Sequence, residues 1–142
     1  MSPRILSVSL LALALVGAAL ASDLPRTPSP AGARVYFESP RNGAVIKGEV
    51  TVRFGLSGMG VAPAGTMAAN TGHHHLIIDS PLPPTDQPVP KDEKHLHFGM
   101  GQTETVLKLA PGKHTLQLLL ADANHIPHDP PVVSEKITIT VK

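Results

Sequence analysis

The chain has 142 residues, with 12 Lys and Arg against 11 Asp and Glu, so its charges nearly balance. This balance argues against a basic surface for nucleic acid. The low aromatic content, with no Trp, one Tyr and three Phe, argues against binding of single strands by base stacking. The absence of Cys excludes disulfides, thiolate metal sites and Cys nucleophiles. The 15 Pro and 12 Gly favour an all-β chain with many turns.

The first 21 residues are typical of a secretory signal peptide. Arg4 supplies a positive charge, an apolar run extends from Ile5 to Leu20, and Ala19-Leu20-Ala21 fits the pattern for cleavage before Ser22. The run is shorter than the roughly 20 apolar residues that a membrane-spanning helix needs. We therefore expect cleavage and no membrane anchor in the mature chain. Export of a chain without disulfides predicts a periplasmic or secreted protein.

Residues 22–33 are rich in Pro, and we expect them to link the signal peptide to a single domain over residues 34–142. Within that domain, short segments alternate between apolar and polar residues, as strands with one buried face do. The expected strands are 35–37, 44–46, 50–56, 74–78, 105–109, 114–121 and 137–141. About seven short strands predict an immunoglobulin-like antiparallel β-sandwich, with a small barrel as the alternative.

The core of this sandwich follows from the same alternation, because residues two apart on a strand share a face. The side chains predicted to be buried together are Val52, Phe54, Leu107, Leu116, Leu118, Ile137 and Ile139. Turn-forming residues such as Asn42-Gly43 and Pro111-Gly112 separate the strands.

The eight His gather in four places: His73-His74-His75, His95-x-His97, His114 and His125-x-x-His128. Alternation places His74 on the core face and places His73 and His75 on the opposite face. We expect His95 and His97 to project side by side in the same way. The last pair lies in a loop stiffened by three Pro. His114 is in register with apolar residues of its strand and is interpreted as a residue at the edge of the core.

Neutral imidazole binds zinc, copper, nickel or iron, and a closed zinc site needs four donors whereas a catalytic site needs three. Two H-x-H pairs and one loop residue would supply them. The candidate ligands are His73, His75, His95, His97, His125 and His128. The structural alternative, an imidazole buried by hydrogen bonding to the backbone, is favoured for His74 and His114.

Methionine refines the choice of metal. Met59, Met67 and Met100 would remain after cleavage, and all three lie in Gly-rich or loop segments rather than in alternating strands. A thioether beside imidazoles in an oxidising compartment favours copper, and His97-x-x-Met100 is the suggestive local pair. Zinc is the second choice because it needs no Met. The structural alternative is that Met59 and Met67 cover one end of the sandwich.

From Phe37 to its C-terminus, the chain resembles the exported bacterial family catalogued as domain of unknown function 4399. Four segments carry the resemblance, and residues 122–131 complete it. The segments are Gly-Met-Gly-Val-Ala-Pro-Ala-Gly at 58–65, Asn-Thr-Gly-His-His-His-Leu at 70–76, His-Phe-Gly-x-Gly-Gln-Thr-Glu at 97–104 and Pro-Gly-Lys-His-Thr-Leu-Gln-Leu at 111–118. The resemblance implies an exported single domain and assigns no activity.

The sequence does not favour an enzyme. A cupin would place a Glu three or four residues after H-x-H, but Gln102 is the nearest candidate here, and the hydrolase elbow G-x-S-x-G does not occur. His95-Leu96-His97-Phe98-Gly99 resembles a short stretch of the copper/zinc dismutases, although their disulfide is missing.

Two functions stay open. The first is an exported metal-binding protein, copper preferred over zinc, that acts as a chaperone, buffer or sensor and contacts a periplasmic partner protein. The second is an immunoglobulin-like interaction module whose His-rich loops need no metal. Convergence of the His clusters in space would favour the first.

Overall fold

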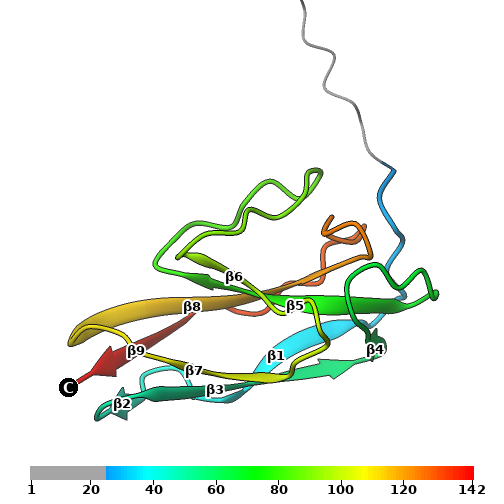
Figure 1. Ribbon diagram of the computed structural model, residues 1–142. Helices are drawn as coiled ribbons and strands as arrows, with labels where there is room; N and C mark the ends of the chain where they lie inside the picture. The colour runs from blue at the N-terminus through cyan, green and yellow to red at the C-terminus, as the bar shows by residue number, and fades with distance from the viewer. Residues whose placement is uncertain (1–24) are drawn as a thin grey trace, which may run out of the picture.

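All seven predicted strands form in the computed structural model of the protein, which describes residues 25–142 (Figure 1). The predicted signal peptide and residues 22–24 lie outside this range. The strands are β1 (Arg34–Ser39), β2 (Val45–Ile46), β3 (Val50–Ser57), β4 (Gly60–Val61), β5 (Thr71–Ile78), β6 (His95–His97), β7 (Glu104–Leu107), β8 (Gly112–Ala121) and β9 (Ile137–Val141). Strand β4 was not predicted, because it lies in a Gly-rich stretch. Strand β6 was not among the expected strands, although its two histidines were expected to project side by side. No helix occurs in residues 25–142, and so none there could span a membrane.

The strands form two sheets, which lie as two layers in Figure 1. The smaller sheet has the order β1-β3-β7. The larger has the order β2-β9-β8-β5-β4, and β6 also pairs with β5. The all-β prediction is confirmed, but the expectation of purely antiparallel sheets is wrong, since β2 runs parallel to β9 and β4 runs parallel to β5. Both parallel ladders are two residues long, and alternation along one strand does not reveal the direction of its partner.

The main core fills the space between the two sheets. All seven side chains predicted to be buried together belong to it. The Phe54 ring of β3 lies with its centroid 4.8 Å from that of Phe98 and 5.1 Å from that of His74. The alternation of β3 therefore turns its apolar face inward, while Thr51 and Arg53 face solvent.

The outer face of the larger sheet is covered as well. Gly72 to Ile78 of β5 are all buried, so this strand is buried on both faces. A second apolar cluster lies on its outer face, formed by Ile77, Leu119, Ala121 and Val89. Val89 comes from the long β5–β6 connection, which rises above the sheet in Figure 1. The segment 122–131 after β8 lies on the same side as this connection, because the Val89 amide donates to the His125 carbonyl over 2.9 Å.

The Pro-rich segment before β1 also contacts the fold. The Ser29 amide donates to the Asp129 carbonyl over 3.0 Å, and the Asp129 amide donates to the Thr27 carbonyl over 2.9 Å. The Thr27 hydroxyl donates to the Asp122 carboxylate over 2.6 Å. Residues 27–29 therefore run alongside the segment that follows β8 and help to hold it in place.

Candidate metal centre

Strand β5 carries two of the His in the candidate centre. His73 and His75 lie two residues apart and therefore project from the same face, opposite Ala121 and Leu119 of β8. Both side chains are buried. The predicted sidedness of this strand is thus confirmed, since His74 lies on the other face within the main core, against Phe54.

Strand β6 supplies a third histidine through its register with β5. His97 pairs directly with His75 across the antiparallel ladder, and the two ring centroids are 5.1 Å apart. Gly99 makes room for this ring, because a Cβ atom at that position would overlap the imidazole of His97. The backbone of residues 97–99 therefore fixes the position of the third ring.

A tight turn after β8 presents the fourth histidine. The His125 amide donates to the Asp122 carbonyl over 3.0 Å, and one Asp122 carboxylate oxygen accepts from the amides of Asn124 and Ile126 at 2.8 and 3.0 Å. His125 adopts a φ of 66°, a left-handed conformation that is uncommon outside Gly. The Asp122 side chain holds the turn in this conformation and directs His125 toward β5.

The four imidazoles converge. One ligand atom of each of His73, His75, His97 and His125 lies within 4.8 Å of the corresponding atom of every other. His73 Nε2 lies 3.0 Å from His75 Nε2 and 3.1 Å from His125 Nδ1. The His97 ring centroid is 4.8 Å from that of His125 and 5.0 Å from that of His73.

These separations match the needs of a single metal ion. Four nitrogens at about 2.1 Å from one ion are about 3.4 Å apart in a tetrahedron and at most about 4.2 Å apart in a square. The closest pairs in the cluster are slightly nearer than the tetrahedral value, and the outer limit of 4.8 Å exceeds the square value by a few tenths of an ångström. Small rotations of the rings would bring all four donors into place.

Three of the four imidazoles are held in the neutral form that binds metals. Burial, followed by repulsion from His125 and His97, lowers the pKa of His73 from 6.5 to about 4. Burial, followed by repulsion from the neighbouring imidazoles, lowers the pKa of His75 to about 2. Burial and the nearby His125 also lower the pKa of His97. Lone pairs are therefore available at neutral pH without loss of a proton.

The hydrogen-bonding potential of the cluster is poorly satisfied by protein groups. His73 Nδ1, His75 Nδ1 and His97 Nε2 are buried and have no hydrogen-bond partner among the described residues. His73 Nε2 makes both short contacts within the cluster, but a nitrogen carrying one hydrogen can donate to only one neighbour. A cation accepting the converging lone pairs would relieve this conflict, so the residues fit a metal ion.

The remaining predicted ligands lie outside this group of four. His95 Nδ1 is 2.8 Å from an Asp92 carboxylate oxygen. His128 is buried, and its Nε2 is 3.1 Å from the Thr71 carbonyl oxygen. Met100 exposes 82% of its surface. Strand β6 thus brings His97 to the centre while its other histidine bonds to a neighbouring turn.

The two histidines interpreted as structural differ from each other. His74 is buried in the main core, and neither of its ring nitrogens has a partner among the described residues. His114 lies at the edge of the sheet, with Nδ1 2.6 Å from an Asp79 carboxylate oxygen and Nε2 2.8 Å from the Ala110 carbonyl. The hydrogen bonds to Asp79 and Ala110 raise the pKa of His114. His114 therefore has the hydrogen bond to the backbone that the structural interpretation expects, whereas His74 packs in the core without one.

Sequence reasoning missed Asp122 and Gly99, which shape the centre. It also missed Lys91, whose charge contributes to the lowered pKa of His97. The sequence Asp122-Ala123-Asn124 carries a usable signal, since Asp favours turns by accepting from backbone amides two residues onward. Gly99 and Lys91 carry no such signal, because their roles depend on the position of the His97 ring.

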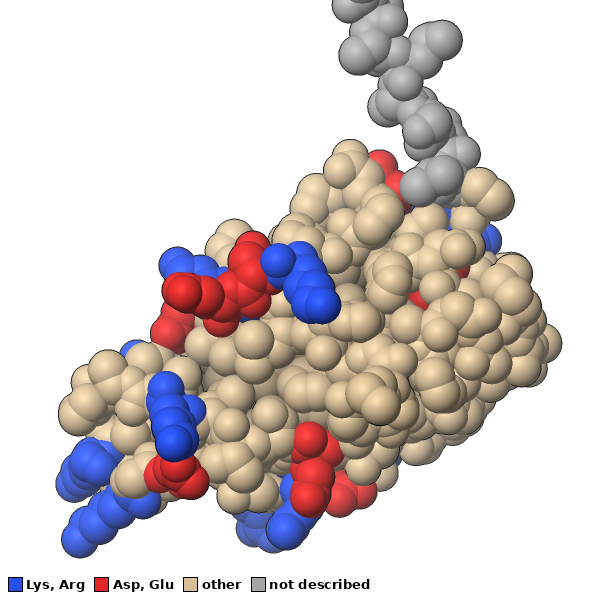
Figure 2. Space-filling view, viewed as in Figure 1, with Lys and Arg blue, Asp and Glu red and all other residues tan. Residues whose placement is uncertain are grey.

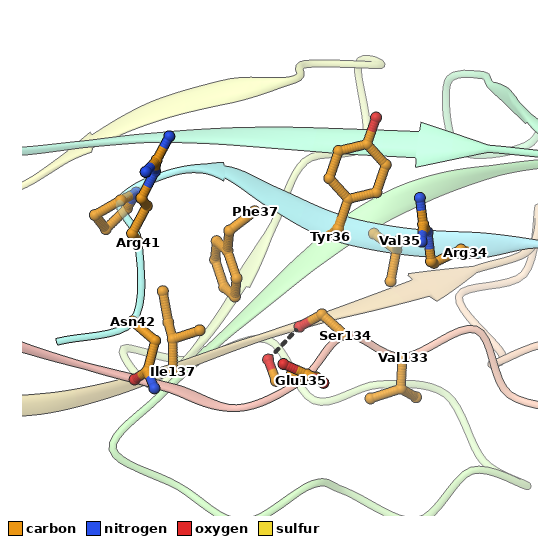
Figure 3. A pocket seen from close by; sticks show the side chains of 11 residues that line it. Arg34, Val35, Tyr36, Phe37, Arg41, Asn42, Val133, Ser134, Glu135 and Ile137 are labelled. Atoms are coloured by element: carbon orange, nitrogen blue, oxygen red, sulfur yellow. Dashed lines mark hydrogen bonds between the residues drawn. The ribbon is translucent and has the colours of Figure 1, made fainter. Parts of the chain in front are cut away.

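A cavity of about 580 Å³ lies away from the four histidines, beside the edge strand β1 (Figure 3). Its lining side chains come from β1, from the residues just after it and from the segment leading into β9. They include Val35, Phe37 and Ile137, with Arg34 and Arg41 beside them. No histidine lines this cavity, so it is separate from the metal centre.

The fold and the centre define an all-β protein with a four-histidine cluster able to hold a metal ion. The family model "Domain of unknown function (DUF4399)" matches residues 52–142, and the chain belongs to this family. The resemblance inferred from the sequence is thereby confirmed. No curated protein and no solved structure matches the chain.

Proposed function

We propose that this protein is an exported metal-binding protein, copper preferred over zinc, that acts as a chaperone, buffer or sensor without turnover. The observation that carries the proposal is the convergence of four imidazole donors from β5, β6 and the turn after β8 within 4.8 Å. A further support is the lowered pKa of His73, His75 and His97, which keeps these three imidazoles neutral and able to bind a metal.

Copper is preferred on the chemistry of the donor set. The cluster offers nitrogen ligands, which suit both Cu²⁺ and Zn²⁺, and sites of this kind generally bind Cu²⁺ more tightly. Thiolates, which favour Zn²⁺ or Cu⁺, do not occur in the chain. Met100 is exposed and lies outside the group of four histidines, so the preference for copper rests on imidazole rather than on thioether ligands. The Ala-Leu-Ala pattern before Ser22 supports export to the periplasm or beyond.

The test compares two alanine variants from the same strand. The parent protein should bind one Cu²⁺ or Zn²⁺ ion per chain, measured by native mass spectrometry and competition titration. His97→Ala removes a proposed donor. Removing a residue that is only hydrogen-bonded to a metal ligand weakens metal binding about 10- to 100-fold. Removing a ligand itself should therefore weaken metal binding at least about 100-fold.

His95→Ala is the matched control, because His95 lies two residues away on β6 and outside the group of four. This variant should bind like the parent. Equal binding by His97→Ala and the parent would contradict the proposed centre. The immunoglobulin-like interaction module, with His-rich loops that contact a partner without metal, would then replace it.

A further inference from the structure

A small cavity borders the candidate metal centre on one side. It measures about 190 Å³, and its lining residues are His75, Pro88, Val89, Lys91, His97 and His125. Three of the four converging imidazoles therefore form part of its wall. His73 lies behind them, in contact with His75 and His125. The cluster thus has one side against the protein and one side facing open space.

The cavity is built into the fold rather than being a gap under a loose loop. Val89 is buried, packs in the outer apolar cluster with Ile77 and Leu119, and donates its amide to the His125 carbonyl. The segment that roofs the cavity is therefore tied to the turn that carries a proposed ligand. Pro88 restricts the backbone next to it.

The charge near the cavity is local and positive. On the face shown in Figure 2, Lys, Arg, Asp and Glu lie in small mixed groups, with no broad field of either sign. Lys91 lines the cavity and has no ion pair within residues 25–142. Burial and repulsion from His125 are the two larger causes of the lowered pKa of His97, and the charge of Lys91 is the third. The Lys91 ammonium therefore acts on the centre.

No carboxylate lines this cavity, and two carboxylates of the neighbouring segments are engaged elsewhere. Asp92 accepts from the Lys94 amide and lies 2.8 Å from His95 Nδ1. The Asp122 carboxylate accepts from Thr27 and from two amides of its own turn. A divalent ion at this centre would therefore add its charge to that of Lys91, and no carboxylate lines the cavity to offset the two.

We propose that the bound metal keeps an open coordination position toward this cavity, and that the position takes a small inorganic anion guided by Lys91. This inference rests on the proposed metal-binding function. The size of the cavity supports it, because about 190 Å³ accommodates a few water molecules or a triatomic anion. Drug-sized ligands occupy about 300–1,000 Å³. Cu²⁺ with four imidazoles in a tetragonal arrangement has such a position, whereas a tetrahedral Zn²⁺ does not.

Azide is the probe for the test. The Cu²⁺-loaded protein, with copper retention checked by native mass spectrometry, is titrated with azide and followed by its ligand-to-copper absorption band and by electron paramagnetic resonance. One azide should bind per copper. Lys91→Ala should weaken azide binding about three- to tenfold, as expected for one charge at the mouth of a partly solvated site, and added salt should reduce the difference.

Lys94→Ala is the matched control, since Lys94 is an exposed lysine of the same connection that does not line the cavity. It should bind azide like the parent. A second variant, Val89→Phe, should fill the cavity and prevent azide binding while copper stays bound.

The possible outcomes distinguish a failure of this inference from a failure of the proposed metal-binding function. Copper bound at one per chain without any response to azide would overturn the open position and leave the metal-binding function intact. Azide binding that is equal in the parent and in Lys91→Ala would overturn the role of Lys91. Failure of the parent protein to bind copper would overturn the proposed function itself.

Discussion

Acid should destabilise the chelator-treated protein strongly, because three successive imidazoles of β5 are buried in the neutral form. Burial lowers the pKa of His74 to about 4, while burial followed by repulsion from other imidazoles lowers that of His73 to about 4 and that of His75 to about 2. The unfolded chain accepts protons at its ordinary pKa of 6.5, but the folded chain resists them. Stability is therefore full above pH 6.5 and is lost as the pH falls toward the folded-state pKa values.

The size of this effect follows from the shift in protonation. At about pH 5, an imidazole with a pKa of 6.5 in the unfolded chain has a ratio of protonated to neutral form of about 30. This protonation favours unfolding by about 2 kcal/mol for each residue. The three buried residues stay neutral in the fold at this pH, so together they lower the free energy of unfolding by about 6 kcal/mol. Small domains are stable by about 5 to 15 kcal/mol in total.

Urea denaturation at about pH 7.5 and about pH 5 measures this difference directly. His74→Leu serves as the informative variant, because His74 lies in the main core and outside the metal centre. It should reduce the acid loss by about one third, since one of three titrating groups is removed. A loss below about 1 kcal/mol in the parent protein would refute the claim that these imidazoles are buried in the neutral form.

Three further predictions concern single residues. Asp122→Ala should weaken metal binding about 10- to 100-fold in a competition titration, because it removes the oxygen that accepts from two amides of the turn that presents His125; unchanged affinity would show that the turn holds without this side chain. Phe54→Ala should lower the free energy of unfolding by about 3 to 5 kcal/mol in urea, since it empties a site between the two sheets. The raised pKa of His114 beside Asp79 means that its bond is fully stabilising below pH 6.5 and is lost as the pH rises through the folded-state pKa. His114→Gln should therefore cost more stability near pH 6 than near pH 9, and an equal cost at both would contradict the ion pair.

Much of the fold could be predicted from alternation alone. Strands β3 and β9 show clear period-two patterns, and every residue that these patterns placed in the core is buried there. The same rule separated His74 from His73 and His75. Alternation does not identify β4, because its two residues lie in a Gly-rich stretch. It did not mark β6 as a strand, although the H-x-H spacing predicted that the two histidines project side by side. It also carries no information on strand direction, so the parallel pairs β2–β9 and β4–β5 were missed.

The membership of the metal centre was only partly predictable, because it depends on contacts between distant segments. His97 joins the centre through its register with His75, whereas His95, two residues away, bonds to Asp92. His125 joins it through a turn closed by hydrogen bonds, whereas His128, three residues further on, bonds to the Thr71 carbonyl. Spacing along the chain identified both pairs as candidates, and tertiary structure selects one residue from each.

The stability of the fold alone does not account for four imidazoles at this position. Leaving a buried polar group without a hydrogen bond costs about 1 to 3 kcal/mol, and three ring nitrogens of the centre are in this state among the described residues. Apolar side chains already cover the neighbouring surface, with Ile77, Leu119 and Val89 in contact there. Similar side chains at the histidine positions would fill the same space without the polar cost. The converging contacts of His73 and His75 are made by Nε2, so a metal bound there would leave the cost at their Nδ1 atoms in place. Sites that serve a function commonly cost stability, so four imidazoles gathered at such a cost argue for a bound ligand that accepts their converging lone pairs.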